Sequence, residues 1–522
     1  MPFIISLSFP TERYVAATMT RRDEVEWPPH PARLILGLLA AHHLGDVLPA
    51  ERAALQWLCE QEPPVVLLPP MEHCVELNMK GVFVPQNPSE AKAVNHPRKE
   101  RAFPSVVLPS DQPSICFHWP VALPDSTTRA ALASLVGKLV RLGHSSSLVL
   151  GTLLDEPPTG VWQRLMPQTG DDPGTPDHRM RVPWHGLLES AENAYDANGR
   201  EEDLVAAFKR RDHAKNSLTK FEASPRGRYD ARHVSCGYSA SSPIGSHSGP
   251  WDSGLCILTR IGGGQLGLDS TWKITSVLHR TILERWSRHS EFGPIPTWIS
   301  GHQPREAGEA TGPALHNHLA MFPLAHVDAP HASGHLLGLA FAIPYMETIG
   351  LDKQTLRLHW RHLLSCLLED GKLSLTPQDH AWTFELGLSD GDSRAALQPS
   401  RWNAAATVWH SVTPIILDRH PKPTFAKDPA VWRESCAEIV SQACQRIGLP
   451  APKSVTPVLH SSLVGVPSSP AFVAPSPRPG RPARFHIHAT IEFAEPVTGP
   501  LLLGAGRFRG YGLMKPETTR PS

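Results

Sequence analysis

The segment GAGRFRGYGLMKP, residues 504–516, carries the most specific local pattern in this chain. Its glycines allow positive φ angles and a close approach of the backbone to a ligand; they are Gly504, Gly506, Gly510 and Gly512. Exposed N–H groups beside Arg507, Arg509 and Lys515 would form a concavity that binds phosphate. Phe508 and Tyr511 offer planes on which bases can stack. The pattern predicts an RNA-binding turn, and the alternative is a tight structural turn under a C-terminal strand.

This glycine-rich segment differs from the loops that bind nucleotides in NTPases. The chain contains no GxxxxGK[ST] pattern, and no helix is expected after residue 516. The sequence therefore disfavours a P-loop.

Strands and helices alternate in three rounds along the rest of the chain. The expected strands cover 3–7, 65–68, 255–258, 318–327, 335–344, 412–417, 455–459 and 485–493. The expected helices cover 32–43, 49–60, 127–142, 270–286, 352–369 and 429–447. Repeated β-α-β-β units over short sheets predict an α+β protein built from tandem ferredoxin-like (RRM-type) modules. Sheets of this kind often bind single-stranded RNA.

Length and composition narrow the class of protein. A chain of 522 residues is long enough for three to four domains, and 50 basic residues balance 50 acidic ones, which argues against a uniformly basic surface. The eight cysteines form no CxxC pair, which excludes zinc ribbons and fits a reducing compartment. No apolar stretch reaches about 18 residues, and the N-terminal MPFIISLSFP lacks the basic start of a signal peptide. We therefore expect a cytoplasmic protein without a membrane span.

The segment from about 195 to 250 is rich in charged and small residues and lacks apolar periodicity. Between 209 and 232 it holds eight basic residues against three acidic ones. Two interpretations stay open, a solvated linker and an arm that contacts RNA.

Histidine is frequent, with 28 residues, and occurs twice in an HxH pattern, at 316–318 and at 486–488. Residues two apart on a strand share a face, so each pair could chelate a metal. No third ligand is fixed by spacing and carboxylates are scarce nearby, so we expect no metal and no cofactor. The alternative for His486 and His488 is a polar outer face of a strand.

RNA cleavage without a metal needs a base for the 2′-hydroxyl, an acid for the leaving 5′-oxygen and a cation for the phosphate. Histidine suits the first two tasks because its ordinary pKa lies near neutrality. His302 follows Gly301 on a long loop, and Arg305 on the same loop could meet a phosphate. His318 and His279 are the other candidates for the base, and each of the three histidines could instead be a hydrogen-bonded structural residue.

The glycine-rich segment resembles the C-terminal glycine-rich loop of the RAMP proteins, the RNA-binding ferredoxin-like proteins of CRISPR systems. Three further stretches add to the resemblance: WPPHPARL at 27–34, WHSVTPIILDRHPK at 409–422 and FHIHAT at 485–490. In this order they resemble the fused crRNA-capping subunit and crRNA-processing endoribonuclease (a Cas-five/Cas-six fusion) of type I-U, or I-G, systems. The resemblance covers nearly the whole chain.

The resemblance implies an organisation and an activity. Residues 1–195 would form the module that holds the 5′ handle of CRISPR RNA, and 196–250 a basic linker. Residues 251–400 and 401–522 would form the two ferredoxin-like halves of a metal-independent endoribonuclease. The implied partners are CRISPR RNA and the backbone and large subunits of a Cascade-like effector complex. A scaffold subunit that only grips RNA is the main alternative and a metallohydrolase a weaker one; no family motif fixes the catalytic histidine here.

Overall fold

The computed structural model describes residues 2–19, 21–44, 46–70, 73–85, 98–169, 172–197, 234–240, 247–303, 314, 316–389, 394–473 and 484–517. The chain forms two compact units. Unit 1 comprises Met1–Pro167 and His178–Tyr238, and unit 2 comprises Gln168–Asp177 and Ser239–Ser522. No helix of the described parts is both long and apolar enough to cross a membrane.

Unit 1 is built on a seven-stranded sheet in the order β7-β1-β6-β3-β8-β10-β9. Its strands are β1 (Phe3–Ser8), β3 (Val65–Leu68), β6 (Ser114–Trp119), β7 (Leu150–Leu154), β8 (Gln163–Pro167), β9 (His178–Arg181) and β10 (Ser235–Ala240). Its helices are α1 (Pro31–Leu44), α2 (Pro49–Cys59), α3 (Ser126–Lys138) and α4 (Leu187–Ala197). The β7-β1-β6-β3 part, with helices between β1 and β3 and between β6 and β7, has the strand order of a ferredoxin-like module.

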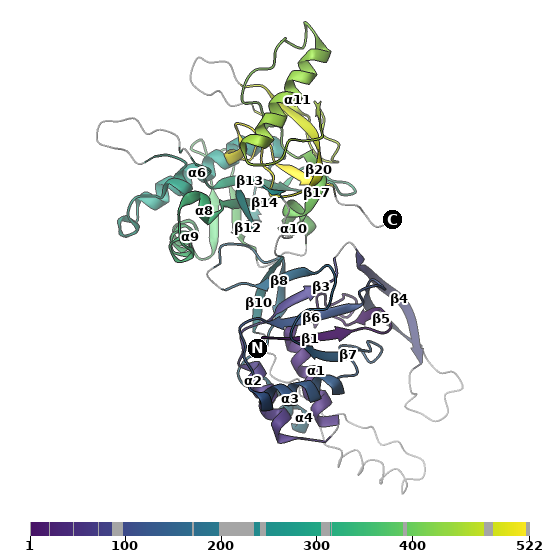
Figure 1. Ribbon diagram of the computed structural model, residues 1–522. Helices are drawn as coiled ribbons and strands as arrows, with labels where there is room; N and C mark the ends of the chain where they lie inside the picture. The colour runs from purple at the N-terminus through teal and green to yellow at the C-terminus, as the bar shows by residue number, and fades with distance from the viewer. Residues whose placement is uncertain are drawn as a thin grey trace. The chain divides into compact units, whose positions relative to one another are not determined.

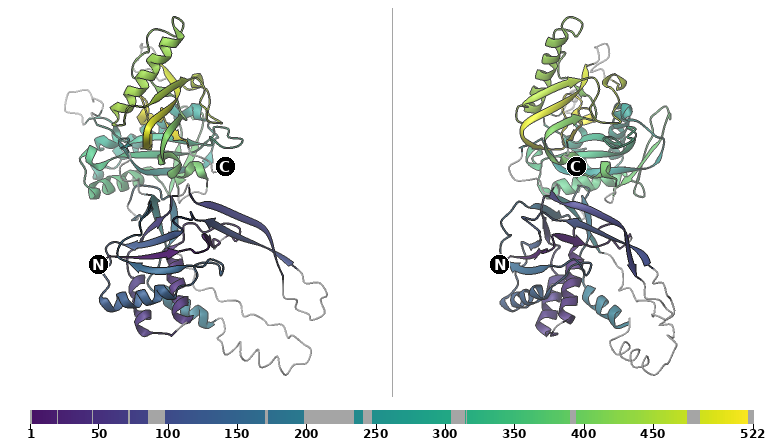
Figure 2. Two further views of the ribbon diagram at one scale, coloured as in Figure 1. Left: turned by 45° about the vertical axis from the view of Figure 1, so that its right-hand side comes forward. Right: turned by 90° about the vertical axis from the view of Figure 1, so that its right-hand side faces the viewer.

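A second, three-stranded sheet in unit 1 consists of β2 (Arg13–Val15), β5 (Arg98–Val107) and β4 (Val75–Pro85), in that order. The β4–β5 hairpin is longer than the strands of the main sheet and extends beyond it, as both views of Figure 2 show.

The first half of unit 2 is a β-α-β-β-α-β run. It consists of β12 (Trp251–Gly263), α6 (Thr271–Ser287), β13 (Ala320–Ala325), β14 (Leu336–Pro344), α9 (Lys353–Leu367) and the hairpin β15 (Lys372–Leu375) and β16 (Phe384–Leu388), with short helices α7 (Thr297–Ser300) and α8 (Met346–Ile349). The sheet is antiparallel, in the order β13-β14-β12-β16-β15. Helices α6 and α9 pack against each other (Figure 1). Leu278 and Ile282 of α6 are buried because they recur at helical spacing on one face.

The second half of unit 2 repeats this order of elements, except that a glycine-rich turn takes the place of the second helix. Its elements are α10 (Ser400–Asn403), β17 (Ala405–Ser411), β18 (Ile415–Ile416), α11 (Pro429–Arg446), β19 (Ser454–Val458), β20 (His486–Thr498) and β21 (Met514–Pro516), and β11 (His247–Ser248) joins its sheet. Strand β20 pairs with β17 and β19, and β21 pairs with β17. The four glycines of the 504–516 segment lie between β20 and β21, where a ferredoxin-like module has its second helix. One apolar core joins both halves.

These topologies confirm the predicted α+β class. The strand predicted over 412–417 is wrong: β17 ends at Ser411, and β18 contains only Ile415 and Ile416. Pro414 has no N–H for a ladder, and the Thr413 hydroxyl donates to the Gly510 carbonyl at 2.7 Å instead. Within the predicted linker 196–250, residues 235–240 form β10, and 198–233 lie outside the described residues.

Candidate functional site

The glycines of the 504–516 segment are required by packing within the protein itself. Gly504 and Gly512 have φ angles of 79° and 68°. A Cβ atom at Gly504 would lie 2.3 Å from the Ile416 carbonyl oxygen, and one at Gly512 would lie 2.0 Å from the Leu503 carbonyl oxygen. Protein atoms also fill the space at Gly506 and Gly510. The expected close approach to a ligand is therefore not what demands glycine here; the tight structural turn accounts for these positions.

Tyr511 and Lys515 do not offer the groups that the sequence suggested for RNA. The Tyr511 side chain is fully buried and its hydroxyl donates to the Val473 carbonyl. Its ring has no free face for a base. The Lys515 side chain is buried as well, and its ammonium pairs with the Asp328 carboxylate. Both residues anchor the segment, and the predictions of base stacking and phosphate binding are wrong for them.

The middle of the segment, η6 (Arg507–Arg509), keeps its three side chains partly exposed. The Arg507 guanidinium lies 4.4 Å from the centre of the Phe508 ring and donates to the Gly504 carbonyl at 3.2 Å. Its Nε atom is buried and, among the described residues, has no hydrogen-bond partner. Arg507 thus has donor capacity that the protein leaves unused.

Arg509 is tied to helix α6. Its Nη1 donates to the Thr275 carbonyl at 3.3 Å, and the Thr275 hydroxyl donates to the Arg509 carbonyl at 3.1 Å. Burial lowers the pKa of Arg509 to about 10, so the side chain is still a cation at neutral pH. Arg509 holds the turn against the first half of unit 2. Its positive charge acts on His279 and His318.

His318 is enclosed between two parts of the chain far apart in sequence. Its ring stacks on Phe508 with the centroids 3.5 Å apart and the planes at 24°. Gly301, at φ 71°, lies so close that a Cβ atom there would be 2.7 Å from the His318 Nε2. Burial, reinforced by the charges of Arg507 and Arg509, lowers the pKa of His318 to about 3. The imidazole is neutral at pH 7 and a weak base.

His279 and His302 contact the same carbonyl group, that of Ser300 at the end of α7. The His279 Nε2 lies 3.0 Å from this oxygen and the His302 Nδ1 lies 2.9 Å from it. A carbonyl only accepts hydrogen bonds, so in each neutral ring the contacting nitrogen carries the proton. The lone pair is then on Nδ1 of His279 and on Nε2 of His302.

His279 and His302 differ in their exposure to solvent. His279 is buried, and burial together with the charge of Arg509 lowers its pKa to about 4. His302 is exposed, and its Nε2 is the ring nitrogen that does not contact the Ser300 carbonyl. The structure brings the three predicted histidines into one cluster beside Phe508, and of the three only His302 is exposed. Arg305 lies outside the described residues.

Ser300 is the member of this cluster that the sequence did not single out. Its hydroxyl donates to the His302 carbonyl at 3.2 Å and lies 3.2 Å from the His302 N–H. Gly301 ends α7 in the left-handed conformation, which turns the chain so that the ring of His302 returns to the Ser300 carbonyl. A serine and a glycine directly before a loop histidine were the available signal.

The second HxH pair is held by hydrogen bonds. The His486 Nε2 lies 2.9 Å from the Ser469 carbonyl, and the His488 Nε2 lies 3.0 Å from the Pro467 carbonyl. His488 also contacts the Ser411 hydroxyl and is fully buried, so the predicted outer-face position is wrong for it. Nowhere in the described ranges do three or more histidine, cysteine or acidic side chains lie close enough together to hold a metal ion.

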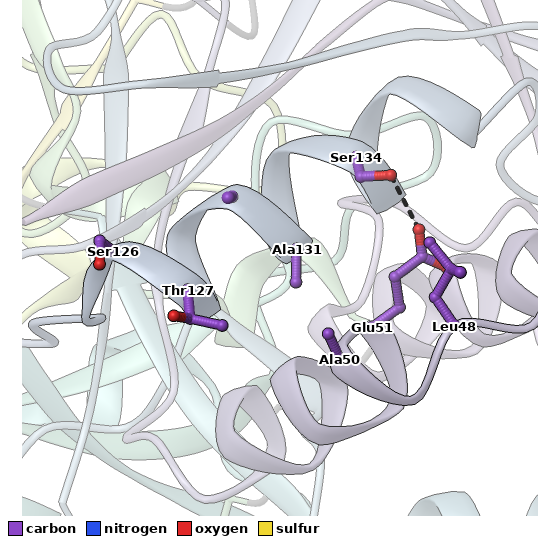
Figure 3. A pocket seen from close by; sticks show the side chains of 8 residues that line it. Leu48, Ala50, Glu51, Ser126, Thr127, Ala131 and Ser134 are labelled. Carbon is purple, nitrogen blue, oxygen red and sulfur yellow. Dashed lines mark hydrogen bonds between the residues drawn. The ribbon is translucent and has the colours of Figure 1, made fainter.

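Unit 1 contains a cavity of about 510 Å³ between α2 and α3 (Figure 3). Its one charged lining residue, Glu51, accepts hydrogen bonds from Ser134 at 2.8 Å and Lys138 at 2.7 Å, and the His42 Nδ1 lies 3.1 Å from its other oxygen. Both carboxylate oxygens are engaged within the protein. We therefore assign Glu51 to the packing of the two helices.

Comparison with known proteins places this arrangement in a family. No curated protein matches the chain. A family model described as "CRISPR-associated protein, GSU0054 family" matches residues 252–516. The match begins in β12 and ends with β21, so it contains both halves of unit 2, the histidine cluster and the glycine-rich segment. The chain belongs to the GSU0054 family of CRISPR-associated proteins.

Proposed function

We propose that this CRISPR-associated protein cuts precursor CRISPR RNA within the repeat by attack of a 2′-hydroxyl, without a metal, and keeps hold of the product. The observation that carries the proposal is that His302 is exposed while its Nδ1 is fixed on the Ser300 carbonyl, which leaves Nε2 for a substrate. A carbonyl that binds one ring nitrogen and leaves the other free is how a histidine is oriented as a general base.

The chemistry follows from the residues present. The His302 Nε2 would take the proton of the 2′-hydroxyl, and the 2′-oxygen would form a bond to the adjacent phosphorus. The bond from phosphorus to the 5′-oxygen then breaks, leaving a 2′,3′-cyclic phosphate upstream and a 5′-hydroxyl downstream. The partly exposed, positively charged side chain of Arg507 is suited to the added negative charge on the phosphate.

His279 and His318 support this reaction in another way. With pKa values of about 4 and 3, both are neutral at pH 7 and are unsuited to protonate the leaving oxygen. His279 shares the carbonyl that orients His302, and His318 supports Phe508 and Arg507 through stacking. We propose positioning roles for both, and water as the source of the proton.

The test uses RNA with the sequence of a CRISPR repeat as the substrate. Cleavage should continue in EDTA, because no step needs a metal, and it should stop when the scissile nucleotide carries a 2′-deoxy sugar, because the nucleophile is gone. Denaturing gels and end-group analysis measure both results. Cutting of the deoxy substrate would rule out 2′-hydroxyl attack.

Arg507 and Arg509 should differ when each is replaced by alanine. Arg507→Ala should weaken RNA binding and reduce the slope of log affinity against log salt by about 0.7, since one phosphate contact is lost from a single strand. Arg509→Ala should in addition lower the melting temperature, because it removes the bond to the Thr275 carbonyl. Equal melting temperatures for the two variants would contradict this division, and an unchanged salt slope for Arg507→Ala would show that Arg507 is structural.

The scaffold alternative has one observation in its favour. His279 is buried and His318 is half-buried, and both have lowered pKa values, as expected for structural residues. A protein that binds the repeat tightly but leaves it uncut under all conditions would favour this alternative.

We also propose that unit 1 is the crRNA-capping module joined to this endoribonuclease, and that the remaining subunits of a type I-U (I-G) effector complex are its partners. The ferredoxin-like order β7-β1-β6-β3 supports the first part.

A further inference from the structure

Three charged side chains next to the glycine-rich segment, those of Asp418, Arg419 and Arg446, have no role in the reaction described above. Strand β18 lies beside this segment: the Ala505 N–H donates to the Ile416 carbonyl at 2.9 Å. The chain then leaves β18 through Asp418 and Arg419, which meet the last turns of helix α11. The charged group therefore lies next to the glycine-rich segment.

Side chains at helical spacing on α11 meet this exit from β18. Glu438, Gln442 and Arg446 are four residues apart and so lie on one face of the helix. Arg446 pairs with Asp418, and Arg419 donates to the Gln442 side chain at 2.6 Å. The side chains of Arg419 and Arg446 are 51% and 50% exposed, so both can be reached from solvent.

Arg507 belongs electrostatically to the same group. Burial lowers the pKa of its guanidinium, the carboxylate of Asp418 opposes this effect, and the charge of Arg446 adds to it. Two arginines thus act around the Asp418 carboxylate, while the third, Arg419, lies 3.7 Å from the Glu438 carboxylate. Exposed Lys422, four residues after Asp418, continues the positive charge.

We infer that Arg507, Arg446 and Arg419 form a continuous strip that binds the phosphates of single-stranded RNA, and that Asp418 is an internal counter-ion which the RNA displaces from Arg446. The inference rests on the proposed RNA-binding function of the glycine-rich segment and adds the path that the strand takes beyond it. A phosphodiester carries one negative charge, as a carboxylate does, and its oxygens match the guanidinium equally well, so it can replace Asp418 as the partner. An exposed ion pair of this kind is weak and easily exchanged.

Arg446 and Asp418 carry opposite charges, so their neutral replacements should change the affinity for RNA in opposite directions. The full-length protein is titrated into a fluorescein-labelled oligouridylate of about 20 nucleotides, long enough to cross one binding site. Arg446→Gln should weaken binding by roughly threefold to tenfold and reduce the salt slope by about 0.7. Asp418→Asn should strengthen binding by roughly threefold, because it removes a negative charge from the path of the RNA.

Arg433→Gln is the matched control. Arg433 is exposed on the same helix, but it lies over the Phe425 ring, 5.7 Å from its centre, and should leave the affinity unchanged. Melting curves of all variants exclude a loss of fold as the cause. Weaker binding in both Arg446→Gln and Asp418→Asn, or no change in either, would overturn the strip and leave Arg446 as a helix-terminal ion pair.

Cleavage is scored separately, so the two proposals can fail independently. A wild-type protein that binds oligouridylate with these opposite effects but leaves the repeat uncut would overturn the nuclease and support the strip. A protein that cuts the repeat while both substitutions are without effect on binding would do the reverse.

Discussion

His302→Ala should reduce the single-turnover rate of repeat cleavage by roughly a hundredfold or more while leaving the affinity for the repeat intact. The loss is large because His302 is the exposed member of the histidine cluster, and the Ser300 carbonyl already holds the neutral ring in the tautomer that leaves the Nε2 lone pair free. Rates measured at a saturating protein concentration distinguish a slower chemical step from weaker RNA binding.

His289→Ala serves as the control for this experiment. His289 is a partly exposed histidine just beyond the end of α6 whose ring contacts Glu291 at 2.9 Å, and its removal should not change the rate. A His302→Ala protein that cuts at the wild-type rate would remove the assignment of the base, and His318→Ala followed by His279→Ala would then be measured.

Gly512→Ala should destabilise unit 2 by about 4 kcal/mol or more, in the range reserved for severe steric conflicts. The new Cβ would lie 2.0 Å from the Leu503 carbonyl oxygen, and the backbone at φ 68° disfavours any side chain. The Leu503 N–H donates to the Gly512 carbonyl at 3.0 Å, so the backbone at 503 and the backbone at 512 cannot move apart without losing this hydrogen bond. Thermal unfolding followed by circular dichroism measures the effect.

Gly448→Ala isolates the backbone contribution. Gly448 follows α11 at φ 89° and has no atom within 4 Å of an added Cβ, so it should cost only about 1–2 kcal/mol. Equal losses for the two variants would show that strain in φ, and not packing against Leu503, makes glycine necessary at 512.

The replacement of a helix by the glycine-rich segment links the fold to the site. A helix between β20 and β21 would cover the sheet with side chains, whereas the turn brings backbone against Ile416 and Leu503. The same turn carries Phe508 onto His318 and Arg509 onto α6. The close packing of the turn thus fixes the positions of Arg507 and Phe508 relative to the histidines.

Much of the architecture could be predicted from local patterns. Runs such as FIISLS at 3–8 are buried strands, and α9 and α11 are capped by Asp352 and Asp428, whose side chains accept from backbone N–H groups of the first turn. The alternation of these elements was sufficient for the α+β class. Strand ends were less predictable where one proline, Pro414, interrupts a run that looks continuous.

The sequence by itself determined the order of the elements, the glycine-rich turn and a short set of histidines, because helix and strand periods and turn residues act over a few neighbours. Only the tertiary structure decided which of those residues are free to act. Tyr511 and Lys515 are buried, Arg509 bonds to a residue 234 positions away, and His302 alone of its cluster is exposed. Burial and partners are set by contacts between segments that lie far apart in the chain, and no local period records them.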